Sequence, residues 1–229
     1  MKMKERYILC DSSTLISLTG SCLEGLLYFF KDKYGVRTLI PRSVEKETVD
    51  TPLSLTTKEY CFSAIRIKDM IHDGVIEVVK DDVSAETKKI MDSANKVFYA
   101  RGSPVTLMHL GETEMLALAK KLEVTSILID ERTTRILIDD PTSMTQHLQD
   151  EFHTSIMVNR QNLAQLADIV RGMEVIRSTE VAFLGYEKGF FSHFEGIEKQ
   201  AAEAALYRLK YAGCAVSFKE IEEYVGKMR

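Results

Sequence analysis

The 229-residue chain has an ordinary globular composition, with 45% hydrophobic and 28% charged residues, which excludes a disordered or fibrous protein. Its formal net charge of -4 excludes a global basic field of the kind that attracts nucleic acid. The four cysteines show no metal-ligand spacing, no signal peptide is recognisable, and no apolar run reaches the roughly 20 residues of a membrane span, so we expect a soluble cytoplasmic protein.

The first apolar run, Tyr7 to Cys10, predicts a strand that ends at an acid. Its residues favour strands and buried positions, so we expect a central strand that is covered on both faces. Asp11 follows at the carboxyl end of this strand, which is the edge where open α/β sheets bind ligands. The alternative is that Asp11, Ser12 or Ser13 only caps the helix that follows.

A second strand, Val36 to Ile40, comes after a strongly apolar helix. The order strand, helix, strand predicts a parallel pair with a right-handed crossover, so both strands end at the edge that carries Asp11. In the next helix, Glu47 lies three residues after Val44 and shares its inward-facing stripe. The alternative is that Glu47 is a solvated first-turn acid, which the helix dipole favours.

The stretch from residue 57 to residue 104 predicts ordinary structural elements. We expect a helix over 57–72, a short strand or extended connection over 75–79 and another helix over 85–99. The loop from Arg101 to Pro104 then interrupts the helical pattern.

The segment from Leu110 to Leu122 predicts a helix that leads into a strand, Ile127 to Ile129. Apolar residues at helical spacing form one face, and Glu112 lies on the inward side of that face, whereas Glu114 lies nearer its edge. A helix that feeds a parallel strand runs antiparallel to it. We therefore expect Glu112, in the first turn, at the same sheet edge as Asp130, which ends the strand.

The predicted topology thus brings four acids together: Asp11, Glu47, Glu112 and Asp130. Carboxylates that lie close together repel one another and have raised pKa values unless a cation neutralises them. A hard cation that prefers oxygen ligands, such as Mg²⁺ or Mn²⁺, suits this set. The pattern predicts a divalent-metal site at the sheet edge.

In their order along the chain, these segments resemble the motifs of the PIN-domain family of metal-dependent nucleases, which includes the ribonuclease toxins of prokaryotic toxin-antitoxin pairs. The sequence ILCDSSTLI resembles the family's opening strand with its Asp and Ser/Thr, and IPRSVEKE resembles its pattern of Pro, Val and Glu. The sequence LGETEMLALA is similar to a Gly-Glu-x-Glu helix start found in one branch, and SILIDERTTR is similar to the strand that ends in Asp. The resemblance covers roughly Tyr7 to Val158.

The resemblance implies a PIN-like three-layer α/β/α fold with a central, mainly parallel sheet. It also implies Mg²⁺- or Mn²⁺-dependent hydrolysis of RNA by a metal-activated water. Its acidic cluster, both catalytic and metal-binding, corresponds to Asp11, Glu47, Glu112 and Asp130, with Ser12 as the accompanying hydroxyl. Further candidates are Glu114 in place of or beside Glu112, Glu131 in place of Asp130, and Arg132 and Arg135 as residues that steer phosphate.

The C-terminal third is predicted to be mainly helical. We expect Thr154 to Val158 to form the last strand of the sheet, which gives a nuclease domain over 1–160 and a helical extension over 161–229. This extension completes the domain or forms a dimer surface, and we expect a homodimer. The aromatic segment Gly185 to Phe194 is expected to pack against the domain or a second protomer, with stacking on RNA bases as the alternative.

Two other functions compete with the ribonuclease. A catalytically inactive PIN-like interaction or RNA-binding module agrees with the negative net charge. A phosphatase of the haloacid-dehalogenase type also places an Asp after its first strand, but it needs a second Asp where this chain has Ser13. The partners expected for the leading function are an RNA substrate and a protein antitoxin or regulator.

Overall fold

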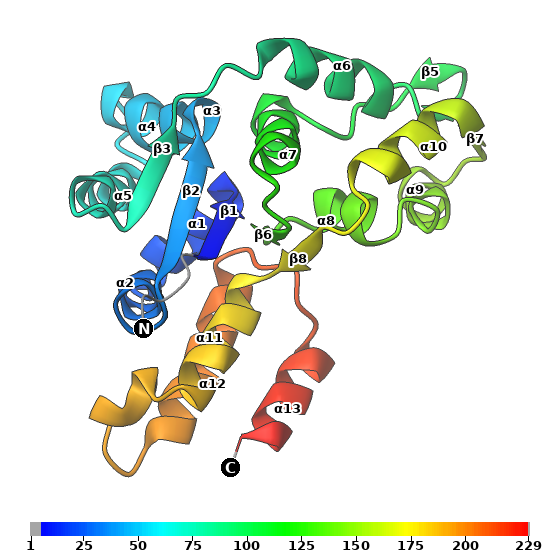
Figure 1. Ribbon diagram of the computed structural model, residues 1–229. Helices are drawn as coiled ribbons and strands as arrows, with labels where there is room; N and C mark the ends of the chain where they lie inside the picture. Colours follow the sequence, from blue (N-terminus) through cyan, green and yellow to red (C-terminus); the bar gives the residue numbers. More distant parts are fainter. Residues whose placement is uncertain (1–5, 229) are drawn as a thin grey trace.

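The computed structural model describes residues 6–228 and is built around a five-stranded sheet with the strand order β3-β2-β1-β6-β8 (Figure 1). Each pair of neighbouring strands is parallel, which confirms the predicted α/β class and the mainly parallel sheet. The strands are β1 (Arg6–Cys10), β2 (Val36–Pro41), β3 (Ile76–Val79), β6 (Ser126–Leu128) and β8 (Glu174–Ile176).

Alternate residues of β1 enter two different hydrophobic cores. Ile8 and Cys10 belong to one core and Leu9 to the other. Because successive side chains of a strand point to opposite faces, the cores lie on opposite faces of the sheet, consistent with three α/β/α layers. The first core contains residues of α1 (Ser12–Gly20), α2 (Gly25–Tyr34), α5 (Cys61–His72), α11 (Ser178–Glu187), α12 (Glu198–Tyr211) and α13 (Phe218–Lys227); the second contains residues of α6 (Ser84–Ala94), α7 (Leu110–Leu122), α8 (Arg132–Asp139), α9 (Met144–Phe152) and α10 (Arg160–Ile169).

The helix that follows β2 includes a π-helical segment. It consists of α3 (Arg42–Glu45), η1 (Lys46–Asp50) and α4 (Thr51–Ser54), and η1 is the π-helical part. Within it the hydroxyl of Thr48 donates a hydrogen bond of 2.7 Å to the carbonyl oxygen of Val44. Glu47 lies in this segment, and π-helical turns are frequent at functional sites. The helix predicted for this position is confirmed.

A second, antiparallel sheet has the order β5-β4-β7. Its strands are β4 (Phe98–Ala100), β5 (Ser103–Pro104) and β7 (Ile156–Val158). The prediction that residues 154–158 form the last strand of the main sheet is therefore wrong. A strand of three apolar residues fits either sheet locally, and only its pairing with β4 decides its position.

The helix predicted over 85–99 is too long, since α6 ends at Ala94. Asn95 ends it by hydrogen bonding through its side chain to distant backbone. Its Oδ1 accepts the N–H groups of Leu107 and Met108, each at 2.9 Å, and its Nδ2 donates to the Met108 carbonyl at 2.8 Å. These bonds hold the loop that leads into α7. The helix predicted over 57–72 is also shorter, because α5 begins at Cys61.

The C-terminal third contributes a strand to the central sheet, since β8 pairs in parallel with β6. After β8 the chain continues through α11, the 3₁₀ helix η2 (Phe190–His193), α12 and α13, which extend from the lower end of the sheet in Figure 1. The capping box predicted for the last helix is present. Ser217 Oγ accepts the N–H of Glu220, and the Glu220 carboxylate accepts the N–H of Ser217.

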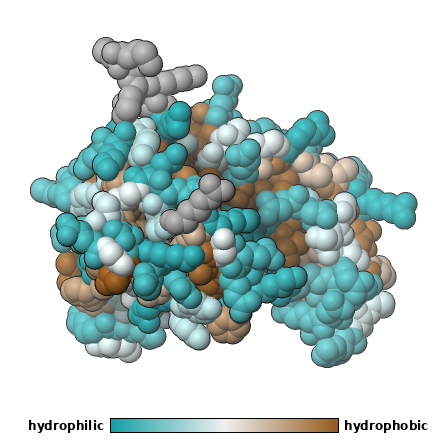
Figure 2. Space-filling model, turned by 90° about the horizontal axis from the view of Figure 1, so that it is seen from below, coloured by the Kyte–Doolittle hydropathy of each residue, from teal (hydrophilic) through white to brown (hydrophobic). Residues whose placement is uncertain are grey.

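The surface seen from below is mostly hydrophilic, with apolar residues in separate patches (Figure 2). In the described part of the chain, no single helix is long and apolar enough to cross a membrane. Together α1 and α2 would pass the same criteria of length and composition, but they are bent by 108° relative to each other.

Candidate acidic site at the carboxyl edge of the sheet

Three adjacent parallel strands, β2, β1 and β6, end at the same edge of the sheet. Asp11 directly follows β1, and its backbone N–H donates a hydrogen bond of 2.9 Å to the carbonyl oxygen of Leu128 at the end of β6. The helix after β2, the helix after β6 and the start of α7 are therefore near this edge. This is the arrangement that the order of elements in the sequence predicts.

Asp11 is buried, with 4% of its surface exposed. Its Oδ2 accepts hydrogen bonds from the hydroxyl of Ser13 at 2.6 Å and from the Ser13 N–H at 3.2 Å, and its Oδ1 accepts a longer bond of 3.4 Å from the Ser12 hydroxyl. Asp11 thus caps α1, as the alternative interpretation proposed. Burial nevertheless raises its pKa, and the charge of Glu131 adds to this, although the bonds from Ser13 and Ser12 oppose it.

Glu47 extends from η1 towards Asp11. The residue as a whole is exposed, but its carboxylate is partly desolvated, and this partial burial raises its pKa. The negative charge of Asp11 raises the pKa further, whereas a hydrogen bond from Ser12 lowers it. A Cβ atom placed on Gly111 would lie 3.6 Å from Glu47 Oε2, so this carboxylate reaches the first turn of α7.

Glu112 lies in that first turn and is half-buried. Its Oε2 accepts a hydrogen bond of 3.0 Å from the N–H of His109. Burial raises the pKa of Glu112, and the charge of Asp11 contributes to the rise. Glu114 has a different role, because its Oε2 accepts the N–H of Ser43 at 3.0 Å and so links α7 to the start of α3.

Asp130 is fully buried, and its carboxylate hydrogen-bonds to α11 rather than facing the other acids. Both of its carboxylate oxygens accept hydrogen bonds of 2.7 Å from Ser178, one from the backbone N–H and one from the hydroxyl. Its own N–H donates to the hydroxyl of Ser13 at 3.2 Å. Burial is the main cause that raises the pKa values of the Cys10 and Cys214 thiols, and the charge of Asp130 raises them further. The Asp130 carboxylate therefore connects the sheet to α11.

Glu131, the next residue, is half-buried and caps α8. Its two oxygens accept the N–H groups of Thr133 and Thr134 at 2.6 and 2.7 Å. Burial alone would raise the pKa of Glu131, but these hydrogen bonds outweigh it and lower the pKa, so Glu131 stays ionised beside Asp11. Arg132 is exposed at the first position of α8.

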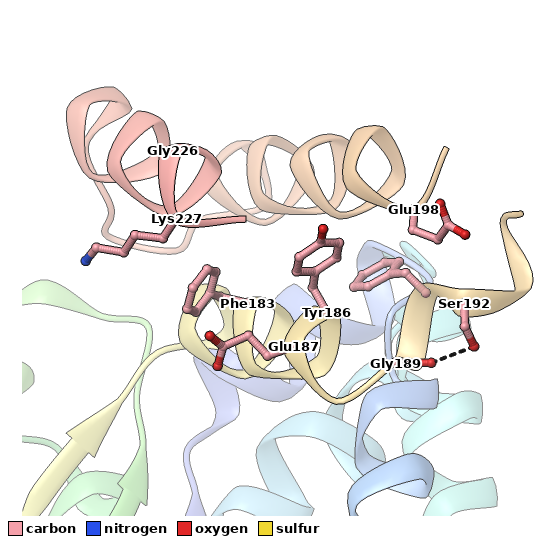
Figure 3. A pocket seen from close by; sticks show the side chains of 9 residues that line it. Phe183, Tyr186, Glu187, Gly189, Ser192, Glu198, Gly226 and Lys227 are labelled. Carbon is pink, nitrogen blue, oxygen red and sulfur yellow. Dashed lines mark hydrogen bonds between the residues drawn. The ribbon is translucent and has the colours of Figure 1, made fainter. Parts of the chain in front are cut away.

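A hollow of about 320 Å³ adjoins the acids. Glu112 and Glu131 form part of its wall, and the loop before α7 and the end of α9 supply the rest. A larger hollow, of about 1040 Å³, lies elsewhere, among α11, η2, α12 and α13 (Figure 3). None of the candidate acids lines the larger hollow, so we consider the smaller hollow to be part of the candidate site.

The side chains around Asp11 fit a hard divalent cation by their chemistry. Asp11, Glu47, Glu112 and Glu131 supply carboxylate oxygens from four different segments, and Ser12 adds a hydroxyl. Burial is the main cause that raises the pKa values of the first three, and the charge of Asp11 adds to the rise for Glu47 and Glu112. As they stand, no three His, Cys, Asp or Glu side chains within residues 6–228 are close enough together to hold a metal ion.

Comparison of the chain with models of protein families, with curated proteins and with solved structures gives no match. The function therefore has to be argued from the site itself.

Two residues bind the acids at this edge in roles that the sequence did not predict. Ser13 joins the Asp11 carboxylate to the backbone of Asp130, although Ser12 was the expected hydroxyl. Ser178 is 48 residues from Asp130, and its only sequence signal is its position before Thr179 and Glu180, which resembles an ordinary helix start.

Proposed function

We propose that this protein is a metal-dependent ribonuclease of the PIN type. The observation that carries this proposal is the buried carboxylate of Asp11, whose charge acts on those of Glu47, Glu112 and Glu131. Acids that are buried close together cost stability, and such groups often mark functional sites. A bound divalent cation would offset this cost.

In this proposal Asp11, Glu47, Glu112 and Glu131 hold Mg²⁺ or Mn²⁺. The metal, when bound, lowers the pKa of a water molecule and stabilises negative charge on a phosphodiester. We place Glu131 in this group rather than Asp130, because Asp130 is fully buried and bound by Ser178 on both oxygens. Glu131 also uses both oxygens, as acceptors for Thr133 and Thr134, but it is half-buried and lines the same hollow as Glu112. Glu131 also remains ionised, which suits a metal ligand.

Ser13 fixes the orientation of Asp11. Its hydroxyl accepts the N–H of Asp130 and donates to Asp11 Oδ2, so the direction of the hydroxyl proton is defined. The weaker contact at Oδ1, 3.4 Å from the Ser12 hydroxyl, leaves that oxygen the more available of the two. Arg132, exposed one residue after Glu131, is the candidate residue to attract a phosphate of the substrate.

A second candidate function is an inactive interaction or RNA-binding module. It is favoured by the spacing of the acids, since no three potential ligands in the described residues are close enough to hold a metal. The ribonuclease proposal requires Glu47 to move towards Asp11 on metal binding. Glu47 is an exposed residue, so its side chain can change rotamer without repacking the core.

The test is a Mn²⁺-supported cleavage assay on a pool of single-stranded and structured RNAs. It compares the wild type with Asp11→Asn and Glu112→Gln, and with Glu222→Gln as a control for an exposed acid on α13. Thermal unfolding with and without Mn²⁺ is measured on the same samples. We expect both site variants to fold, to lose cleavage and to lose the stabilisation by Mn²⁺, while the control behaves like the wild type.

The two functions differ in their outcomes. Cleavage that is insensitive to Asp11→Asn would exclude this site as the catalytic centre. A wild type that neither cleaves RNA nor gains stability from Mn²⁺ would support the inactive module.

A further inference from the structure

The hollow beside the acids is lined by both apolar and polar residues. Its apolar residues are Val105, Leu107, Leu148 and Phe152, and its polar residues include Thr106 and Glu151. Leu148 is buried, with 1% exposed, whereas Phe152 is 41% exposed. The lining thus combines buried apolar surface with an aromatic ring that solvent can reach.

In the absence of a bound cation, the charge of the hollow disfavours a free phosphate as its occupant. Glu112, Glu131 and Glu151 all line it, and no lysine or arginine is among the described residues that do so. A bare phosphate would be repelled by these carboxylates. A neutral flat group that carries hydrogen-bond donors is attracted by the same lining.

The size of the hollow suits one planar ring system. Its volume of about 320 Å³ is at the lower end of the range for small-ligand pockets, roughly 300 to 1,000 Å³. A single nucleobase meets these requirements, because it has an apolar face for stacking on an aromatic ring and polar groups along its edge.

We propose that this hollow binds one unstacked base of the RNA substrate next to the cleaved phosphodiester, and that Glu151 selects guanine over uracil. This inference rests on the proposed function and specifies its substrate as single-stranded RNA, since a base within a duplex is stacked and paired and does not enter such a hollow.

Glu151 has the chemistry for this selection. Its side chain is 57% exposed, and the ring of His147 contacts it with Nε2 at 3.8 Å from Oε2, so the carboxylate is available to a ligand. Guanine presents two adjacent donors, N1–H and the N2 amino group, that match the two oxygens of a carboxylate. Uracil presents one donor between two carbonyl oxygens, which the carboxylate repels.

The experiment maps cleavage of a randomised RNA by sequencing the products. The variants are Glu151→Gln, Phe152→Ala and, as the matched control, Asp150→Asn. Asp150 is the neighbouring acid on α9, accepts a hydrogen bond of 2.8 Å from Gln146 and does not line the hollow. Circular dichroism and thermal unfolding verify that each variant is folded.

For the wild type we expect one position near the cut at which guanine is preferred over uracil by roughly tenfold. Glu151→Gln is expected to abolish that preference, because a donor has replaced one acceptor oxygen, whereas the control Asp150→Asn is expected to keep both the preference and the total cleavage of the wild type. Phe152→Ala is expected to weaken kcat/KM for all sequences roughly tenfold, through loss of stacking. A preference that is absent in the wild type, or unchanged in Glu151→Gln, would overturn the inference.

A binding measurement separates this inference from the proposed function. If the wild type cleaves no RNA, the proposed function fails, and the hollow is then tested by fluorescence anisotropy with labelled five-nucleotide RNAs that contain either guanine or uracil, in the presence of EDTA. Tighter binding of the guanine RNA that is lost in Glu151→Gln supports the base site. Equal binding of the two RNAs, or no binding, overturns it.

Discussion

Ser178 holds both carboxylate oxygens of Asp130, with its backbone N–H on one and its hydroxyl on the other, each at 2.7 Å. Asp130 lies two residues after the end of β6, and Ser178 lies in the first turn of α11, so the pair links the sheet to this helix. Asp130 and Ser178 are both fully buried. A negative charge at a helix N-terminus is favourable, and a buried carboxylate requires such partners. Asp130 therefore has a structural role, because it binds the N-terminus of α11 to the end of the sheet.

The first prediction separates the roles of Asp130 and Glu131. Asp130→Asn is expected to lower the free energy of unfolding by about 1–3 kcal/mol, because it weakens charge-assisted bonds to a buried donor. Glu131→Gln retains an acceptor for the α8 cap, so it is expected to lower stability by less than about 1 kcal/mol and to weaken Mn²⁺ binding. Chemical denaturation and metal titration measure the two effects. The reverse pattern, with Mn²⁺ binding lost only in Asp130→Asn, would place Asp130 in the metal site.

This distinction shows where sequence reasoning reaches its limit. Side chains alternate regularly past the end of β6, since Ile127 and Ile129 belong to one core and Leu128 to the other, so Asp130 lies on the same face as Leu128. On that face Ser178 of α11 binds both oxygens of Asp130. No local signal in the sequence brings Ser178, 48 residues further along the chain, to this carboxylate.

The second prediction concerns the pH dependence of stability at Asp11. Its folded pKa is raised above the unfolded value, so the folded state binds more protons than the unfolded state in that interval. The free energy of unfolding therefore falls as the pH rises from about 4, the usual aspartate value, through the raised pKa.

Asp11→Asn removes this penalty and keeps an acceptor for Ser13. We expect the variant to have a higher Tm than the wild type at pH 7.5 in EDTA, and the difference to disappear below about pH 4. Mn²⁺ should reverse the order at pH 7.5, because only the wild type binds it. If Asp11→Asn is less stable at pH 7.5, the capping bonds contribute more to stability than desolvation removes.

The parts of the site that the sequence did predict follow from topology. The βαβ order and the antiparallel course of α7 were sufficient to place Asp11, Glu47 and Glu112 at one edge. The aromatic segment was also interpreted correctly as packing, since Phe191 is 2% exposed and the rings of Phe190 and Phe29 are 5.5 Å apart. These predictions depend on periodicity and order, which a sequence contains.

The sequence did not predict which strand completes the main sheet: residues 154–158 were expected there, but β8 occupies that position and β7 belongs to the second sheet. Each is a strand of three residues with apolar character, and nothing in either segment specifies its partner. Pairing over such a short length is decided by the rest of the fold, through the contacts of β4 with β7 and of β6 with β8.

The third prediction concerns the ion pair that fastens the last helix. Arg177 is 5% exposed and binds Glu220 with Nη1 at 2.8 Å from Oε1. Partial burial would raise the pKa of Glu220, but the N–H of Ser217 and the charge of Arg177 lower it to about 2. Because the folded pKa is depressed, Glu220 stabilises the fold above the usual glutamate pKa, and this stabilisation is lost as the pH falls towards 2.

Glu220→Gln is therefore expected to have a lower Tm than the wild type at pH 7, with a difference that shrinks as the pH falls from about 4.5 towards 2. Glu222→Gln, at an exposed position of the same helix, is the control and should match the wild type throughout. A Tm difference for Glu220→Gln that is constant with pH would show that the charge of the Glu220 carboxylate does not stabilise the packing of α13.

The fourth prediction compares two glycines in helices. A Cβ on Gly185 in α11 would lie 2.5 Å from Cδ2 of Leu26, whereas a Cβ on Gly226 in α13 would have no atom within 4 Å. Leu26 is fully buried, so it has no free space into which to move. Gly185→Ala is expected to lower the free energy of unfolding by about 1–3 kcal/mol through overpacking between α11 and α2. Gly226→Ala is expected to raise it by about 0.5–1 kcal/mol, because alanine restricts the unfolded chain and favours a helix.

Chemical denaturation measures both effects, and a double variant identifies the cause at Gly185. Leu26→Val removes volume at the contact, so Gly185→Ala should be less destabilising in the Leu26→Val background than in the wild type. The effects of two substitutions that share a contact are not additive, and the difference is the coupling between α11 and α2. Strictly additive effects would show that the steric contact with Leu26 is not the reason for glycine at position 185.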